Sequence, residues 1–227
     1  MGAVKNNLLD RIRIVLVEAK EPGNVGSVAR AMKNMGLSRL TLVAPPNFHS
    51  GDARKMAHGS GDILYGANIA KTLGEALSGT TLAVGTTHRK RRDYNLFYGP
   101  RKVARHLLSL PEGAEGALVF GREENGLTNQ ELQMCQVTAH IPTAHHYPSL
   151  NLAQSVLIFG YELYRATKNP PEPSSLEFAS FEEIEYMYDH ISSALNKLGF
   201  ISRNRSSTFM RSIRRLLGRT FLEQRDV

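Results

Sequence analysis

Short apolar runs alternate with helical segments between residues 11 and 167, and this alternation limits the possible folds more than any other feature. Asn24 is placed to cap a helix whose apolar positions follow helical spacing up to Gly36. Such alternation is typical of a parallel sheet covered by helices. The sequence therefore predicts an α/β fold with a parallel sheet, whose strands are expected at residues 13–17, 40–44, 81–85, 117–121 and 137–141.

The pattern changes after residue 168. The helix expected over residues 150–167 is apolar on more than one face, so we expect a second copy of the chain to cover it. A run rich in Pro and Ser then predicts a linker. Ser180 and Glu183 have the spacing of a capping box, as do Thr72 with Glu75 and Thr128 with Glu131. We divide the chain into a main domain (residues 1–168), a linker (169–179) and a helical, basic extension (180–227) that should dock on the main domain or on a partner.

Composition restricts the location and the partners of the chain. Lys and Arg number 28 against 21 Asp and Glu, a net charge of +7 that favours a polyanionic partner such as nucleic acid. No apolar run approaches the roughly 18 residues of a membrane span, and no export signal is visible. Cys135 is the single cysteine, which fits a reducing cytoplasm. We expect a cytoplasmic protein without a membrane partner and without a metal.

Basic residues gather in two places. The first cluster is followed by Tyr94, Phe97 and Tyr98, aromatic residues suited to stacking on unpaired bases. The second lies in the tail, beyond the linker. Solvated surface charge is the simpler interpretation of either cluster, but two clusters favour a large polyanion over a small acidic metabolite. The candidate RNA-binding residues are Arg89, Lys90, Arg91 and Arg92 in the first cluster and Arg211, Arg214 and Arg215 in the second.

Three turns that follow predicted strands are rich in Gly, Asn and Ser. In the first, Asn24 and Arg30 suit an oxyanion or phosphate near a helix start. The second, residues 121–126, has two glycines that let backbone approach a ligand. The third, residues 141–151, enters a helix with Ser149 and Asn151. Each turn also has a purely structural interpretation, as a helix cap or a solvated turn.

These turns resemble the motifs of the SPOUT class of RNA methyltransferases, in the SpoU/TrmH branch that methylates ribose 2′-hydroxyls. The matching stretches are Asn24 to Met32, Val119 to Leu127, and Ile141-Pro142 with Ser149 to Ala153. The resemblance implies a deep trefoil knot in the C-terminal part of the sheet, which connection rules alone would make improbable. It also implies an obligate homodimer that binds S-adenosylmethionine.

The resemblance assigns roles to individual residues. It implies a catalytic Arg30, with Asn24, Glu123, Ser149 and Asn151 as the motif polar residues around it. The guanidinium hardly loses its proton, so we expect Arg30 to bind phosphate and to stabilise the developing alkoxide. Three candidates for the proton acceptor stay open: the phosphate, water and a transiently neutral Arg30. The implied cofactor-binding residues are Thr86, Thr87, His88, Gly121, Ile141, Pro148, Ser149 and Leu150.

The tail further resembles branch members that modify nucleotide 32 of the tRNA anticodon loop. The expected function is therefore 2′-O-methylation of tRNA. A ribosomal RNA methyltransferase of the same branch is the main alternative, and a non-catalytic RNA-binding protein is a more distant one.

Overall fold

The computed structural model describes residues 8–46, 48–89, 97–144, 149–200, 206–218 and 220–227. These residues form a seven-stranded sheet in the order β3-β2-β1-β6-β4-β7-β5, in which every neighbouring pair is parallel. The strands are β1 (Ile12–Val17), β2 (Arg39–Val43), β3 (Asn68–Ala70), β4 (Thr80–Thr86), β5 (Phe97–Tyr98), β6 (Glu115–Phe120) and β7 (Val137–Ala139). The parallel α/β prediction and its five strands are confirmed. The sequence missed β3 and β5, because β3 has only one buried residue, Ala70, and β5 has only two residues, so neither shows an apolar pattern.

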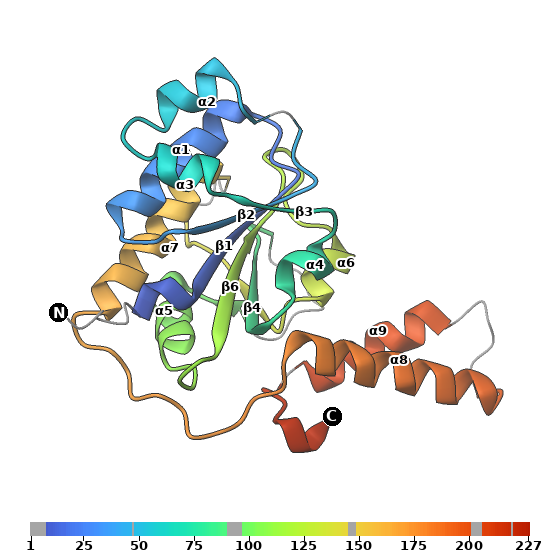
Figure 1. Ribbon diagram of the computed structural model, residues 1–227. Coiled ribbons are helices and arrows are strands. Elements are labelled where there is room, and N and C mark those ends of the chain that lie inside the picture. The colour runs from blue at the N-terminus through green and yellow to red at the C-terminus, as the bar shows by residue number, and fades with distance from the viewer. Residues whose placement is uncertain (1–7, 47, 90–96, 145–148, 201–205, 219) are drawn as a thin grey trace.

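Helices cover both faces of the sheet (Figure 1). Leu16 and Val15 are neighbours on β1 but belong to different hydrophobic clusters, since successive strand residues point to opposite faces. Leu16 packs on the side of α1 (Pro22–Asn34), α5 (Pro100–Leu108) and α7 (Leu152–Ala166), and α7 packs against both of the others. Val15 packs on the side of α4 (Leu73–Leu77) and α6 (Asn129–Gln133). Short helices α2 (Gly51–Met56) and α3 (Gly61–Tyr65) lie against α1.

The start of α1 differs from the prediction. Its N-cap is Glu21, and Pro22 occupies the first turn, where the missing proline N–H costs nothing. Asn24 therefore lies inside the first turn, and the prediction that it caps this helix is wrong. Gly36 has a φ of 74° and follows the helix end, as expected. Asn151 does cap α7, where its side chain accepts a hydrogen bond from the backbone N–H of Ala153 at 2.9 Å.

The extension consists of α8 (Phe181–Lys197), α9 (Ser206–Leu217) and a 3-10 turn at Gln224–Asp226. Its docking on the main domain is visible at the start of α8, where the Glu182 carboxylate accepts hydrogen bonds from Ser78 Oγ and from the backbone N–H of Gly79. The last residues fold back over α5, since the ring of Phe221 lies 5.5 Å from that of His106. Figure 1 shows the extension beside the lower end of the sheet.

Candidate functional site

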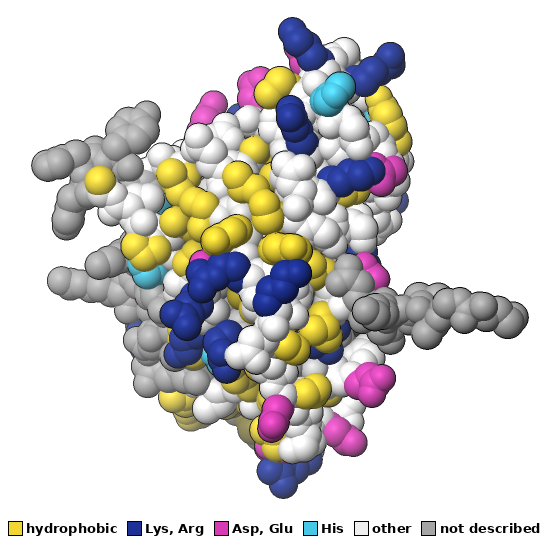
Figure 2. Space-filling model, turned by 90° about the vertical axis from the view of Figure 1, so that its left-hand side faces the viewer, with side chains coloured by type: hydrophobic (Ala, Val, Ile, Leu, Met, Phe, Trp, Pro, Cys, Tyr) yellow, Lys and Arg dark blue, Asp and Glu magenta, His cyan; other side chains and the backbone are white. Residues whose placement is uncertain are grey.

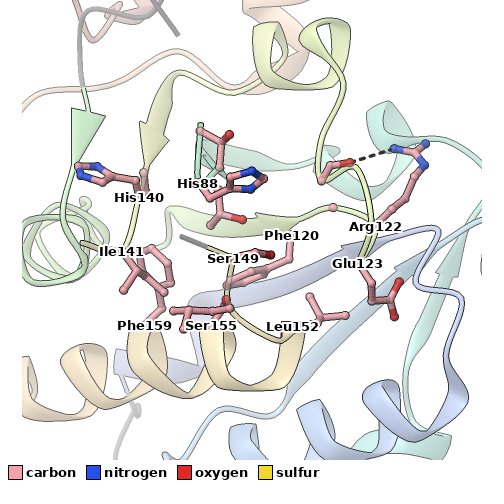
Figure 3. A pocket seen from close by; sticks show the side chains of 16 residues that line it. His88, Phe120, Arg122, Glu123, His140, Ile141, Ser149, Leu152, Ser155 and Phe159 are labelled. Carbon is pink, nitrogen blue, oxygen red and sulfur yellow. Dashed lines mark hydrogen bonds between the residues drawn. The ribbon is translucent and has the colours of Figure 1, made fainter. Parts of the chain in front are cut away.

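A pocket opens at the carboxyl ends of three neighbouring strands, β6, β4 and β7. Ligands of open α/β sheets bind at this edge, where the loops after the strands diverge. The lining of the pocket combines apolar side chains with a few polar groups, as is typical of small-molecule sites. Figure 3 shows residues from all three loops and from the start of α7 around it. The lining residues are Thr86, Thr87, His88, Phe120, Gly121, Arg122, Glu123, Gly126, Ala139, His140, Ile141, Ser149, Leu150, Leu152, Ser155 and Phe159.

The structure brings the predicted cofactor residues together. Thr86, Thr87 and His88 line the pocket after β4, Gly121 after β6 and Ile141 after β7, and the loop into α7 adds Ser149 and Leu150. Pro148 lies outside the described residues. Sequence reasoning missed the apolar wall of Phe120, Leu152 and Phe159, since buried side chains of this kind look like any core residue in the sequence.

Backbone forms much of the wall because the loop after β6 is tightly folded. A Cβ atom on Gly121 would lie 2.2 Å from the carbonyl carbon of Gly126 and 2.3 Å from the nitrogen of Leu127. Gly126 has a φ of 65°, and its N–H donates to the carbonyl oxygen of Arg122 at 2.8 Å. Only glycine fits at the first position, and it is favoured at the second.

Arg122 anchors this loop to two other segments. Its guanidinium donates to both carboxylate oxygens of Glu18, at 2.6 and 3.0 Å, and to both of Glu131 in α6, at 3.0 Å. The two carboxylates raise the pKa of Arg122 still further, so its charge is permanent. Glu18 follows β1 directly and has a φ of 47°, a strained conformation for a non-glycine residue. No sequence pattern predicts the Glu18 contact, which joins residues 104 positions apart.

A second polar chain joins the three predicted motifs. The Asn24 side chain donates from Nδ2 to Glu123 Oε1 at 3.1 Å and accepts at Oδ1 from Asn151 Nδ2 at 3.0 Å. The Glu123 carboxylate also accepts from the backbone N–H groups of Lys20 and Glu21 at 3.2 and 3.4 Å. One amide therefore connects the loop after β1, the loop after β6 and the cap of α7.

The environment of Glu123 keeps it ionised. Partial burial by itself would raise its pKa, but hydrogen bonds from Asn24 and from backbone N–H groups outweigh burial and hold the pKa below the usual value. Glu123 therefore carries a negative charge at neutral pH. The lowered pKa makes Glu123 a weaker general base than an ordinary carboxylate. Its carboxylate instead holds in place the groups that donate hydrogen bonds to it.

Arg30 lies apart from this network. It is exposed on α1, is not among the residues that line the pocket, and its side chain makes no hydrogen bond or ion pair with another described residue. Ser149 is exposed and lines the pocket. Of the candidate catalytic residues, the structure thus joins Asn24, Glu123 and Asn151 directly, places Ser149 at the same pocket, and leaves Arg30 on the surface.

The candidate RNA-binding residues fall into three groups. Arg89 is exposed beside the pocket residue His88, whereas Lys90, Arg91 and Arg92 lie outside the described residues. Arg211 and Arg215 are exposed on α9. The guanidinium of Arg214 is bound by Glu185, with contacts of 2.5 and 2.7 Å, and lies 4.1 Å from the ring centroid of Tyr188.

Two properties of the described residues concern metals and membranes. Within the described ranges, no three His, Cys, Asp or Glu side chains come close enough to hold a metal ion. None of the helices in the described part of the chain is both long and apolar enough to cross a bilayer.

Comparison with known proteins covers both parts of the chain. Residues 11–161 match the SpoU rRNA methylase family, and residues 182–227 match the C-terminal domain of the tRNA methyltransferase TrmJ. The chain is 42% identical, over 97% of its length and 91% of the relative, to tRNA (cytidine/uridine/adenosine-2′-O-)-methyltransferase TrmJ of Pseudomonas aeruginosa. It is 38% identical, over 97% of its length and 93% of the relative, to tRNA (cytidine/uridine-2′-O-)-methyltransferase TrmJ of Photorhabdus laumondii. The crystal structure of TrmJ from Zymomonas mobilis (Z. mobilis ZM4) superposes with a TM-score of 0.80 at 30% identity, covering 91% of this chain and 89% of that chain.

Proposed function

The chain belongs to the SpoU methylase family, and from this premise we propose that it is a tRNA 2′-O-methyltransferase of the TrmJ type with nucleotide 32 of the anticodon loop as its target. The observation that carries the proposal is the joint match of one chain to the SpoU family and to the TrmJ C-terminal domain. The TrmJ proteins similar to it over nearly its full length are tRNA 2′-O-methyltransferases by name. In the reaction, the methyl group passes from sulfur to the ribose 2′-oxygen, and the hydroxyl proton leaves.

The pocket at the ends of β6, β4 and β7 fits S-adenosylmethionine as the methyl donor. Gly121 lets the loop after β6 close tightly on the backbone of Gly126 and Leu127, and both Gly121 and Gly126 line the pocket without a side chain. Phe120, Ile141, Leu152 and Phe159 offer apolar surface, while Thr86 and Ser155 offer hydroxyls. The cofactor supplies a methyl group already activated by a positively charged sulfur. The protein then has to orient the ribose and exclude water, and no metal is needed.

The polar chain supports the catalytic geometry. Asn24 fixes the loop after β6 to the cap of α7 through Glu123 and Asn151, so the two loops that flank the pocket keep their spacing. Ser149 offers its hydroxyl at the same edge. We assign Arg30 to the phosphate next to the reacting ribose, where its charge also stabilises the developing alkoxide. The proton passes to that phosphate, to water or to a transiently neutral Arg30.

Substitution of Arg30 by Lys tests this assignment. The variant keeps the charge but loses the planar fork that binds phosphate with two hydrogen bonds. We expect single-turnover methylation of tRNA to fall at least ~100-fold, as expected for loss of two charge-assisted hydrogen bonds. Near-normal methylation by Arg30→Lys would exclude the role. Arg54→Lys is a matched control, because Arg54 is exposed on α2 and does not line the pocket.

The proposal includes a homodimer. On the described surface of α7, Leu157, Tyr161 and Tyr164 are 38%, 49% and 41% exposed. Figure 2 shows hydrophobic side chains gathered on this side of the molecule, next to Lys and Arg. A contiguous apolar patch of this kind is typical of an interface. Leu157→Glu should turn a dimer into a monomer in sedimentation experiments, whereas an unchanged sedimentation coefficient would exclude this face.

Three further parts of the proposal concern the fold, the domains and the location. We propose that the chain forms the deep trefoil knot of the SPOUT class, supported by its membership of the SpoU family. The division into residues 1–168, 169–179 and 180–227 is supported by the two family matches, which lie on either side of the linker. A tRNA substrate and a single, buried cysteine support a cytoplasmic location.

One experiment tests the reaction and its substrate. Purified protein is incubated with S-adenosylmethionine labelled in the methyl group and with either total tRNA or ribosomal RNA, and the methylated riboses are mapped. We expect label at position 32 of tRNA. Label in ribosomal RNA alone would favour the ribosomal alternative. Cofactor binding without transfer to either RNA, or no cofactor binding, would contradict the enzymatic proposal.

A further inference from the structure

A second cavity lies between the main domain and the extension, away from the cofactor pocket. Residues of α6 and of the segment that leads into β7 form one wall, and residues of α8 and α9 form the other. We propose that this cleft binds an unpaired nucleotide of the tRNA, at a distance from the methylated ribose. The inference rests on the proposed tRNA methyltransferase function and assigns a second RNA contact to it.

The position of the cleft separates it from the cofactor pocket. Thr138 of β7 lines the cleft, and the next residue, Ala139, lines the cofactor pocket. Successive residues of a strand point to opposite faces of a sheet, so the two cavities lie back to back across β7. Both can therefore be occupied together, and the nucleotide in the cleft is a different one from the nucleotide that is methylated.

The floor of the cleft is apolar and its walls carry versatile hydrogen-bonding groups. Leu132, Ile184 and Tyr188 are 0%, 6% and 5% exposed and form part of the floor. The side-chain amides of Asn129 and Gln133, which line the same cavity, each offer a donor and an acceptor. This combination suits a nucleobase, which has two apolar faces and an edge of donors and acceptors.

Charge complementarity favours a phosphate group beside that base. Four charged residues line the cleft, and Arg214 is bound to Glu185 within it. With Arg211 and Arg215, which are exposed on α9, the lining holds three arginines against one carboxylate and carries a net positive charge. The guanidinium of Arg214 covers one face of the Tyr188 ring, and a base can stack on the planar guanidinium itself. A cation pair at the mouth of a flat, apolar cleft fits a nucleotide better than an acidic peptide.

The cleft lies between α6 of the main domain and α9 of the extension, and a nucleotide can enter it while its phosphates stay joined to the rest of an RNA strand. A nucleobase can enter such a cleft only when it is unpaired, because paired bases are stacked inside the duplex. The proposed occupant is therefore a looped-out or single-stranded residue of the tRNA.

Filling the cleft tests the inference. Ser212 is exposed on α9 and lines the cavity, and Ser212→Trp places an indole in the proposed base site. We expect tRNA affinity, measured by filter binding at fixed salt, to fall about 5- to 150-fold, the range for loss of one stacked base. The affinity for S-adenosylmethionine, measured by calorimetry, should stay unchanged. Ser193→Trp is the matched control, because Ser193 is exposed on α8 and does not line the cleft.

The charge at the mouth is tested separately. Arg211→Gln should reduce by about one the slope of the logarithm of tRNA affinity against the logarithm of salt concentration, as for loss of one phosphate contact. Lys197→Gln removes the same charge from an exposed site of α8 outside the cleft and should leave the slope unchanged. A photo-crosslinking phenylalanine analogue in place of Ser212 should react with an unpaired tRNA nucleotide.

Several results would overturn the inference. Equal tRNA affinity of Ser212→Trp and Ser193→Trp would show that no nucleotide binds in the cleft. A crosslink confined to a base-paired stem would show the same. The Ser212→Trp variant could keep its tRNA affinity while the wild-type protein binds cytidine monophosphate saturably. These two results together would assign the cleft to a free small molecule. If the wild-type protein binds tRNA and methylates it in these cases, the proposed function stands without the cleft. If the wild type does neither, the proposed function itself fails.

Discussion

Replacement of Asn24 by Asp removes one hydrogen bond from the polar chain while it preserves the shape of the side chain. The Asn24 amide donates to Glu123 Oε1 at 3.1 Å. In the variant, two carboxylates meet at this position, although the contact from Asn151 to residue 24 can persist. The change therefore isolates the interaction between residues 24 and 123.

The size of the effect follows from two terms. A hydrogen bond to a charged group contributes about 1.5–3 kcal/mol. Two like charges about 4 Å apart repel by about 1 kcal/mol in water and about 4 kcal/mol near a protein surface. Since Glu123 is half-buried and solvent screens the pair, we take the lower part of both ranges. We expect a loss of about 2.5 kcal/mol in the free energy of unfolding at pH 8, or about 5–10 °C in Tm for a chain of this size.

The loss should depend on pH with a defined sign. Repulsion raises the pKa of one of the two carboxyls in the folded variant above its unfolded value, so the folded state binds more protons than the unfolded state. The stability of the variant relative to the wild type then falls as the pH rises through the raised pKa. In the wild type the pKa of Glu123 is lowered instead, and its contribution is lost only as the pH falls below the usual carboxylate range.

Thermal unfolding followed by circular dichroism at pH 5, 6.5 and 8 measures this difference. The Tm of Asn24→Asp should approach that of the wild type at pH 5 and separate from it at pH 8. Asn68→Asp adds the same charge at an exposed position of β3 and should shift Tm by less than about 1 °C at every pH. A Tm loss for Asn24→Asp that is equal at pH 5 and pH 8 would refute the assigned geometry.

Three further predictions concern other parts of the molecule. Gly121→Ala forces a Cβ to within 2.2 Å of backbone, and we expect it to destabilise the fold by about 1–3 kcal/mol. Binding of S-adenosylmethionine, measured by calorimetry, should weaken at least ~10-fold. Unchanged affinity would show that the loop after β6 does not shape the cofactor site. Burial raises the pKa of Cys135 to about 12. At pH 8 its thiol should therefore react with Ellman's reagent at least ~100-fold more slowly in the native protein than in urea. Equal rates would contradict its burial. Arg214→Met leaves the carboxylate of Glu185 without its bidentate partner, so protease cleavage within residues 180–227 should accelerate. The control is Arg225→Met, because the side chain of Arg225 is 78% exposed.

The sequence predicted most of the framework from local patterns. The five predicted strands appear as apolar runs, and the capping boxes at Thr128 and Ser180 begin α6 and α8 as expected. These features depend on hydrogen bonds within a few residues, so neighbouring residues in the chain are enough to specify them. The three motifs could be recognised from the sequence as well, because each consists of residues that are close together in the chain.

The function of Asn24 shows where local reasoning fails. Its sequence context, just before an apolar helical stripe, is that of a helix cap, but Pro22 starts the helix earlier and frees the amide for Glu123 and Asn151. Both partners are distant in the chain, at separations of 99 and 127 residues. The amide meets them because the sheet order brings the loop after β6 next to the loop after β1.

The sequence by itself determined most of the strands and helices, which glycines and polar residues follow the strands, and which family the motifs indicate. The tertiary structure alone decided that Arg122 is held between Glu18 and Glu131, that Arg214 is bound by Glu185, and that α6 and α9 enclose a cleft. The physical reason is distance along the chain. Local patterns fix the backbone hydrogen bonds of each element, whereas ion pairs and cavities arise only when the order of the strands and the docking of the extension bring remote side chains together.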